Sequence, residues 1–220
     1  MKIPKKYGML NRPNKSIMGW LMNEKFFDLK REKQDRIINA GLKIFAKYGY
    51  RHATTDDIVK EAGISKGLLF HYFTNKVGVY VFLMDYSVRF LLLELSRSVE
   101  EREDNFFELS KQIEWGKLQV LRVYPYMEAF LERAFREECE EALKECREHK
   151  ENYYTKTEAY YKLCKEEDFA GNASLEKIKT MAEYIRKQIT AEHVDLNTME
   201  PERMYQQFCE YMDLLKGAFQ

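Results

Sequence analysis

The stretch TTDDIVKEAGISKGLLFHYFTNK, residues 54–76, predicts two short helices joined by a tight turn. Thr54 or Thr55 can cap the first helix, because a threonine oxygen accepts a hydrogen bond from a free first-turn N–H group. Asp57 follows Thr54 by three residues, which is close to a capping box with Asp in place of Glu or Gln. Gly63 then ends the helix, since glycine enters the left-handed conformation at little cost. The apolar face of this helix is formed by Ile58, Val59 and Ala62.

The second helix of the pair is expected to begin after Ser65 and to run from about Lys66 to Phe73. Leu69 and Phe73 are four residues apart and share one face, which we assign to the core. A glycine inside a helix costs roughly 1 kcal/mol relative to alanine, so Gly67 is best explained by the close approach of a large surface such as a groove wall. The short glycine-containing turn fits a helix-turn-helix unit. From the local pattern alone, a helical hairpin packed inside an ordinary all-helical protein is the alternative.

Residues 31–80 resemble the DNA-binding domain of TetR-type transcriptional regulators. The matching segments are RIINAGLKIFAKYGY (36–50), TTDDIVKEAGISKGLLFHYF (54–73) and Lys76, in the right order and spacing. The rest of the chain matches only by its length and helical character. The resemblance implies an all-α protein, with an N-terminal three-helix helix-turn-helix domain followed by a helical ligand-binding and dimerisation domain.

The resemblance also implies a role for each position of the second helix. Lys66, Gly67 and Leu68 correspond to positions that meet base edges. Phe70 stands where the family usually has tyrosine, so one hydroxyl contact is lost. Leu68 stands where threonine is frequent; leucine can touch a thymine methyl group but cannot hydrogen-bond a base. Backbone contacts and DNA shape are therefore expected to carry much of the specificity. The expected DNA-binding residues are Thr54, Thr55, Lys66, Gly67, Leu68, Phe70, His71, Tyr72 and Lys76, of which Thr55, Tyr72 and Lys76 correspond to phosphate contacts.

The distribution of charge supports a nucleic-acid partner, although the net charge of the whole chain is zero. Residues 1–80 contain 16 Lys or Arg against 7 Asp or Glu, whereas residues 81–220 contain 20 against 29. The basic part includes the helix-turn-helix stretch, as an electrostatic footprint for DNA requires. We expect double-stranded operator DNA to be the partner.

Three domains are expected along the chain: a flexible basic extension (1–28), the helix-turn-helix domain (29–75) and the helical regulatory domain (76–220). Three interpretations of the extension remain open. It can be a basic arm that enters a minor groove, a disordered tail, or a segment foreign to the natural protein, since Met18 or Met22 would serve as starts. We favour the second or third over a functional arm.

Few glycines and prolines interrupt the chain, so long helices are expected. The first helix should run from about Lys30 to Tyr48, where Gly49 stops it and Tyr50 packs into the core. Later helices are expected at 76–97, 104–121, 175–193 and 201–218. The stretch 125–165 is too long for one ordinary helix unless it bends or breaks, and FAGNAS (169–174) is the clearest loop.

The last two helices each carry an apolar stripe, which can be buried within one chain or between two. In TetR-type proteins these helices pair with their copies, so the resemblance favours a homodimer. The expected interface residues are Ile178, Met181, Ala182, Ile185, Ile189, Met204, Phe208, Tyr211 and Leu215.

The body is rich in Tyr, Phe and Met, which build cores and can also line a small-molecule pocket. The family implies an unknown inducer that binds there and releases a repressor from its operator. The candidate lining residues are Trp115, Met127, Phe130, Tyr153, Tyr154 and Tyr160.

Cys139, Cys146 and His149 share one region and would suit a metal or redox sensor. However, they lie among many charged residues and include no closely spaced cysteine pair, so we expect no metal site and no cofactor. No catalytic motif is recognisable, and we expect no enzyme activity. Without a secretory signal or an apolar run of membrane-spanning length, the protein is expected in the cytoplasm. The rivals to a regulator are a ligand-binding or scaffold protein that no longer reads DNA, and a helical enzyme.

Overall fold

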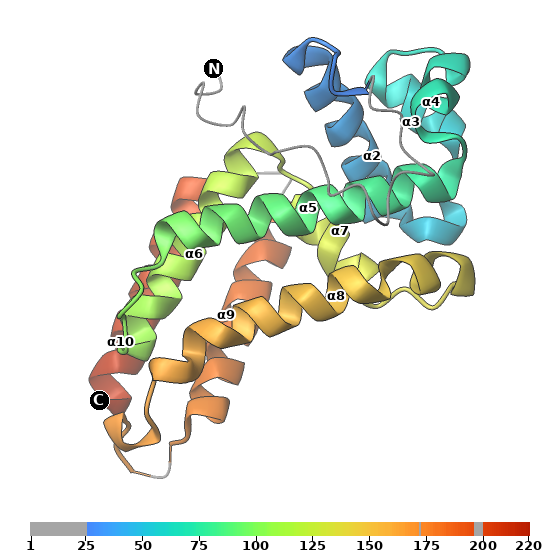
Figure 1. The fold of residues 1–220 in the computed structure, drawn as a ribbon. Coiled ribbons are helices and arrows are strands. Elements are labelled where there is room, and N and C mark those ends of the chain that lie inside the picture. The colour runs from blue at the N-terminus through green and yellow to red at the C-terminus, as the bar shows by residue number, and fades with distance from the viewer. Residues whose placement is uncertain (1–25, 172, 196–199) are drawn as a thin grey trace. The chain divides into compact units, whose positions relative to one another are not determined.

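The computed structural model describes residues 26–171, 173–195 and 200–220, which fold as helices without any strand (Figure 1). The all-α expectation is confirmed. The elements, in order, are α2 (Arg31–His52), α3 (Thr55–Ala62), α4 (Lys66–Phe73), α5 (Lys76–Ser98), α6 (Phe106–Val123), α7 (Met127–Ala134), α8 (Glu140–Tyr160), the short 3₁₀ turns η3 (Tyr161–Leu163) and η4 (Glu166–Asp168), α9 (Leu175–Asp195) and α10 (Pro201–Phe219).

The predicted helices are all present with ends shifted by a few residues. The stretch 125–165 breaks between α7 and α8, as its length required. Pro201 occupies the first turn of α10, where a missing N–H group costs nothing. No helix among the described residues is long and apolar enough to cross a membrane.

The helix α2 is interrupted near its end by Gly49, which has φ 69° and ψ 177°. This backbone conformation is essentially restricted to glycine. The expected stop at Gly49 is therefore confirmed, and Tyr50 packs into the core with 2% of its surface exposed. Tyr48, the residue before Gly49, is 39% exposed. Gly49 turns the chain immediately after it.

The chain packs as two compact units. The first comprises residues 26–90 and 123–153 of the described chain, and the second comprises residues 91–122 and 154–220 with the gaps given above. These units do not follow the expected boundary at residues 75 and 76, because α5 shares the core of α2–α4 as far as Phe90. The functional division into domains stays a prediction.

The core of the first unit is aromatic. Phe45 and Tyr80 meet edge to face with centroids 4.9 Å apart, and Phe130 of α7 lies 5.4 Å from Tyr80. Helix α2 packs against both α3 and α7. A second, polar cluster joins α2 to α5: Tyr124 donates to Asp35 at 2.7 Å, and the Tyr86 and Tyr124 hydroxyls are 2.7 Å apart.

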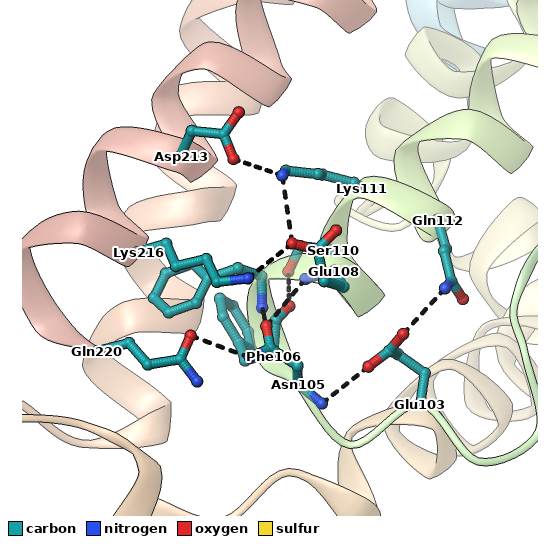
Figure 2. A network of polar contacts seen from close by, with 11 residues as sticks. Glu103, Asn105, Phe106, Glu108, Ser110, Lys111, Gln112, Asp213, Lys216 and Gln220 are labelled. Carbon is teal, nitrogen blue, oxygen red and sulfur yellow. Dashed lines mark hydrogen bonds and ion pairs between the residues drawn. The ribbon is translucent and has the colours of Figure 1, made fainter.

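In the second unit, α9 packs against α10, and the end of α10 is fixed to the start of α6. Asn105 caps α6 by accepting hydrogen bonds from the N–H groups of Phe107 and Glu108 at 3.0 and 3.2 Å. Glu108 accepts a bond from Lys216 at 2.9 Å, and Lys111 pairs with Asp213 (Figure 2). The lysine contacts lower the pKa of Glu108.

The expected extension 1–28 is only partly within the described residues. Phe26 is fully buried, and Gln34 donates to the carbonyl oxygen of Phe27 at 3.0 Å. Phe26 thus belongs to the core, whereas Phe27 is half-buried and Asp28 is exposed. Residues 1–25 lie outside the described part of the chain.

Candidate DNA-binding interface

Local capping fixes the ends of α3 and α4. The Thr54 hydroxyl oxygen accepts a hydrogen bond from the Asp57 N–H group at 3.1 Å and donates to the Asp57 carboxylate at 2.6 Å. Gly63 ends α3 in the left-handed conformation, with φ 62° and ψ 43°. Ser65 then accepts from the Leu68 N–H group at 3.2 Å. Each cap satisfies a backbone donor that a helix start leaves unpaired. The predicted turn between the two helices is confirmed (Figure 1).

Helix α4 has one covered face and one open face. Leu69 and Phe73 are fully buried, as predicted, and Tyr72 is only 7% exposed. On the open face, Lys66, Gly67 and His71 are exposed, while Leu68 and Phe70 are half-buried. The open face thus presents side chains of mixed character that the fold itself does not cover.

Gly67 lies on this open face in an ordinary helical conformation. A Cβ atom added there would meet no heavy atom within 4 Å. No contact among the described residues therefore requires glycine at this position. The close approach of a groove wall at Gly67 stays a prediction.

The charge on the open face is partly balanced by α3. The Lys66 ammonium lies 2.8 Å from the Asp56 carboxylate, and both side chains are largely exposed. An exposed pair of this kind contributes about 0–1 kcal/mol to stability, so Lys66 is free to exchange its partner.

The three expected phosphate contacts differ in how accessible they are. Thr55 is half-buried at the start of α3. The Tyr72 ring packs 5.6 Å from Phe26. Lys76 donates to the carbonyl oxygens of Tyr50 and Ala53 at 2.9 and 3.3 Å. Lys76 therefore already hydrogen-bonds carbonyl groups at the end of α2. The sequence alone does not reveal this role, because the partners lie 23–26 residues away along the chain.

The comparisons with known proteins agree with this geometry. The family model "Bacterial regulatory proteins, tetR family" matches residues 37–81, which run from α2 through α3 and α4 into α5. Residues 37–81 are thus similar to the corresponding segment of TetR-family regulators.

Two curated relatives from Bacillus subtilis illustrate the sequence likeness. The HTH-type transcriptional regulator YuxN is 38% identical over 56 residues, which are 26% of this chain and 19% of the relative. The fatty acid metabolism regulator protein is 27% identical over 73 residues, which are 33% of this chain and 38% of the relative. The matched part of the chain thus spans well under half the length of either relative. These relatives are named as regulators and not as enzymes.

Solved structures share the fold over most of both chains. FadR from Bacillus halodurans has a TM-score of 0.55 and 19% identity, covering 80% of this chain and 97% of its own. FadR from Bacillus subtilis, crystallised with stearoyl-CoA, has a TM-score of 0.55 and 15% identity, covering 80% and 96%. PfmR from Thermus thermophilus has a TM-score of 0.56 and 15% identity, covering 82% and 94%.

The end of α2 is held by residues of α7, of α8 and of the turn between them. Arg133 donates to the carbonyl oxygens of Ala46 and Lys47 at 3.4 and 3.3 Å. Glu137 accepts from the Tyr50 N–H group at 3.2 Å, and Glu141 accepts from the Tyr50 hydroxyl at 2.6 Å. Burial and the bond to Glu141 raise the pKa of Tyr50. Apart from Gly49, no local sequence signal predicts these contacts between the end of α2 and residues 133–141.

The six expected ligand-lining residues are divided between the two packing units, so the predicted pocket stays a prediction. Met127, Phe130 and Tyr153 belong to the first packing unit, whereas Trp115, Tyr154 and Tyr160 belong to the second. Met127 and Phe130 are core residues, while Trp115 and Tyr154 are 41% and 46% exposed. An open pocket of about 610 Å³ in the first unit has a different lining, which includes Tyr48, Arg51, His52, Arg133, Arg136 and Cys139.

Most of the residues expected at the dimer interface, on α9 and α10, are covered by other residues of the same chain. Ile178, Ala182, Ile189, Met204 and Phe208 are at most 7% exposed, and Ile185 and Leu215 are half-buried. Side chains so covered have little surface to offer a partner. Met181 and Tyr211 are 38% and 47% exposed, and they are joined by two residues that the sequence analysis did not name, Tyr184 at 67% and Leu214 at 69%.

The cysteines do not form a metal site with their neighbours. Cys146 is buried, which raises the pKa of its thiol to about 12. His149 lies 3.6 Å from the Asp85 carboxylate. Within the described residues there is no group of three or more His, Cys, Asp or Glu side chains placed to hold a metal ion.

Proposed function

We propose that this chain is a repressor that binds a pseudo-palindromic operator as a homodimer and is released by a small-molecule inducer. The observation that carries the proposal is the open face of α4, where the exposed Gly67 leaves room for a groove wall. Lys66, Leu68 and His71 flank that opening and are the side chains proposed to reach base edges. Thr54, Thr55, Phe70, Tyr72 and Lys76 would position the helix along the backbone.

The proposed dimer uses the exposed apolar side chains of α9 and α10. Met181, Tyr184, Tyr211 and Leu214 are large side chains whose exposure is unfavourable in water, and a second copy would cover them. To read successive major grooves, the two α4 helices of the proposed dimer would have to lie about 34–36 Å apart. Light scattering at micromolar concentration tests this: a dimer mass is expected, and a monomer mass would refute the proposal. In the variant Tyr184→Asp/Leu214→Asp, a monomer is expected.

The inducer is proposed to bind the body and to favour one separation of the two α4 helices over another, since equal binding to both shifts nothing. FadR from Bacillus subtilis was crystallised with stearoyl-CoA. We therefore choose a long-chain acyl-CoA as the first probe. Its addition is expected to lower operator affinity; unchanged affinity would remove this ligand class.

The decisive experiment is selection of binding sites from a random duplex pool, followed by affinity measurements against salt. An enriched pseudo-palindrome is expected. Lys66→Ala should weaken binding to that duplex, whereas Lys162→Ala, which removes the same charge from an exposed site in the second unit, should not. Salt-sensitive binding without any enriched sequence would leave only nonspecific electrostatics and overturn the proposal.

A further inference from the structure

The segment that precedes α2 is packed against the recognition helix. Phe26 is fully buried, and its ring centroid lies 5.6 Å from Tyr72 and 5.1 Å from Phe73, both on α4. On its other side, Phe26 lies 5.1 Å from Phe82 of α5. The ring therefore fills the space between the end of α4 and the side of α5.

This segment is held in place by hydrogen bonds as well as by packing. The Gln34 amide donates to the carbonyl oxygens of Phe27 and Leu29 at 3.0 and 2.8 Å. Gln34 is itself 7% exposed, so these bonds are shielded from water. A shielded side-chain amide would lose its partners if the segment moved, which is costly. The position of Phe26 is thus fixed relative to the first two turns of α2.

Helix α4 depends on such contacts for its orientation. It has only eight residues, and a helix so short is not stable by itself in water. Three of its side chains are buried: Leu69, Tyr72 and Phe73. Phe26 touches two of the three. These two lie in the last turn of α4, and His71, on the open face, lies 5.1 Å from the Tyr72 ring.

We infer that Phe26 is a positioning residue for DNA recognition, which sets the tilt of α4 through Tyr72 and Phe73. The inference rests on the proposed function. Phe26 precedes the segment 37–81 that the family model matches, so the family pattern does not include it. If the ring is removed, the last turn of α4 can settle into the space left behind. The open face then presents Lys66, Leu68 and His71 to the groove at a changed angle.

The test compares Phe26→Ala with Phe90→Ala. Phe90 is equally buried in the same unit. Its ring stacks on Tyr86 and meets Tyr124 edge to face, and neither of these residues belongs to α4. Both variants lose the same volume from the core. The probes are the duplex enriched from a random pool by the wild-type protein and a scrambled duplex of equal length. Affinities are measured well below the melting temperature of each variant and corrected for the folded fraction.

The ratio of enriched-duplex to scrambled-duplex affinity is expected to fall about tenfold in Phe26→Ala, comparable to one mismatched base pair. In Phe90→Ala it should change by less than about twofold, as for a site without shared contacts. Phe26→Leu, which keeps most of the apolar volume, should restore most of the ratio. Equal changes in Phe26→Ala and Phe90→Ala would overturn the inference.

Two further measurements keep the inference testable in every case. If Phe26→Ala does not fold, Gln34→Met loosens the segment without removing the ring and should lower the ratio; an unchanged ratio would overturn the inference.

If the wild-type protein does not discriminate between duplexes, the proposed function fails. Amide hydrogen exchange then decides the role of Phe26: exchange in α4 should be faster in Phe26→Ala than in Phe90→Ala, and equal exchange would contradict it.

Discussion

Replacing Gly67 by alanine should make the protein more stable and a poorer DNA binder at the same time. Gly67 lies in the first turn of α4, its backbone is helical, and an added Cβ atom would meet nothing within 4 Å. Alanine is favoured over glycine by about 0.8–1 kcal/mol in a helix interior, and the gain is smaller near a helix start. We therefore expect Gly67→Ala to raise the free energy of unfolding by about 0.5–1 kcal/mol.

The expected loss in DNA binding has a different origin. If the groove wall lies against Gly67, a methyl group must push α4 away or displace a contact. The cost should resemble that of one mismatched base pair, about 1–3 kcal/mol of specific binding free energy. Because the two effects have opposite signs, they distinguish a lost DNA contact from a damaged fold. A variant with a damaged fold would lose both stability and DNA affinity.

Urea unfolding and binding to the enriched duplex measure the two effects in one set of preparations. Gly217→Ala is the matched control, since Gly217 is also helical, exposed and without a heavy atom within 4 Å of an added Cβ. It should gain similar stability and leave DNA affinity unchanged, and light scattering checks that its mass is unaltered. Unchanged DNA affinity in Gly67→Ala would refute the reasoning about the groove, and a loss of stability would refute the reasoning about the helix.

Three variants and one thiol measurement test the packing of the first unit. Gly49→Ala should lower stability by about 2–4 kcal/mol, because a Cβ atom would meet Arg133 Nε at 2.8 Å in a conformation that only glycine adopts. Gly63→Ala, with free space around it, should cost only about 1 kcal/mol, and equal losses in urea unfolding would contradict the role of the clash. Lys76→Met should lower stability by about 1–3 kcal/mol, because two carbonyl groups lose a charged donor; weaker DNA binding at unchanged stability would instead assign Lys76 to phosphate alone. The pKa of Cys146 is raised to about 12, so about one thiol in 10,000 is ionised at pH 8. A thiol reagent should therefore modify Cys146 only after unfolding. Modification of Cys146 in the native protein as fast as that of the half-buried Cys139 would disprove this.

The sequence by itself determined the local features of the helix-turn-helix unit. Thr54, Gly63 and Ser65 bond backbone groups three or four residues away, so their identities and spacing are sufficient to place the ends of α3 and the start of α4. Leu69 and Phe73 were assigned to the core from the helical period alone, for the same reason. The candidate DNA face follows directly, because it is the remainder of α4.

Only the tertiary structure shows which side chains outside α3 and α4 are available for binding. Phe26 and Lys76 are in contact with residues far along the chain, and no spacing rule connects them to Tyr72 or to the end of α2. The apolar stripes of α9 and α10 have the right period for an interface, yet most residues of both stripes are buried within the chain. Tyr184 and Leu214 are exposed instead. A period identifies a face of a helix, but the neighbour that covers the face comes from a distant part of the chain.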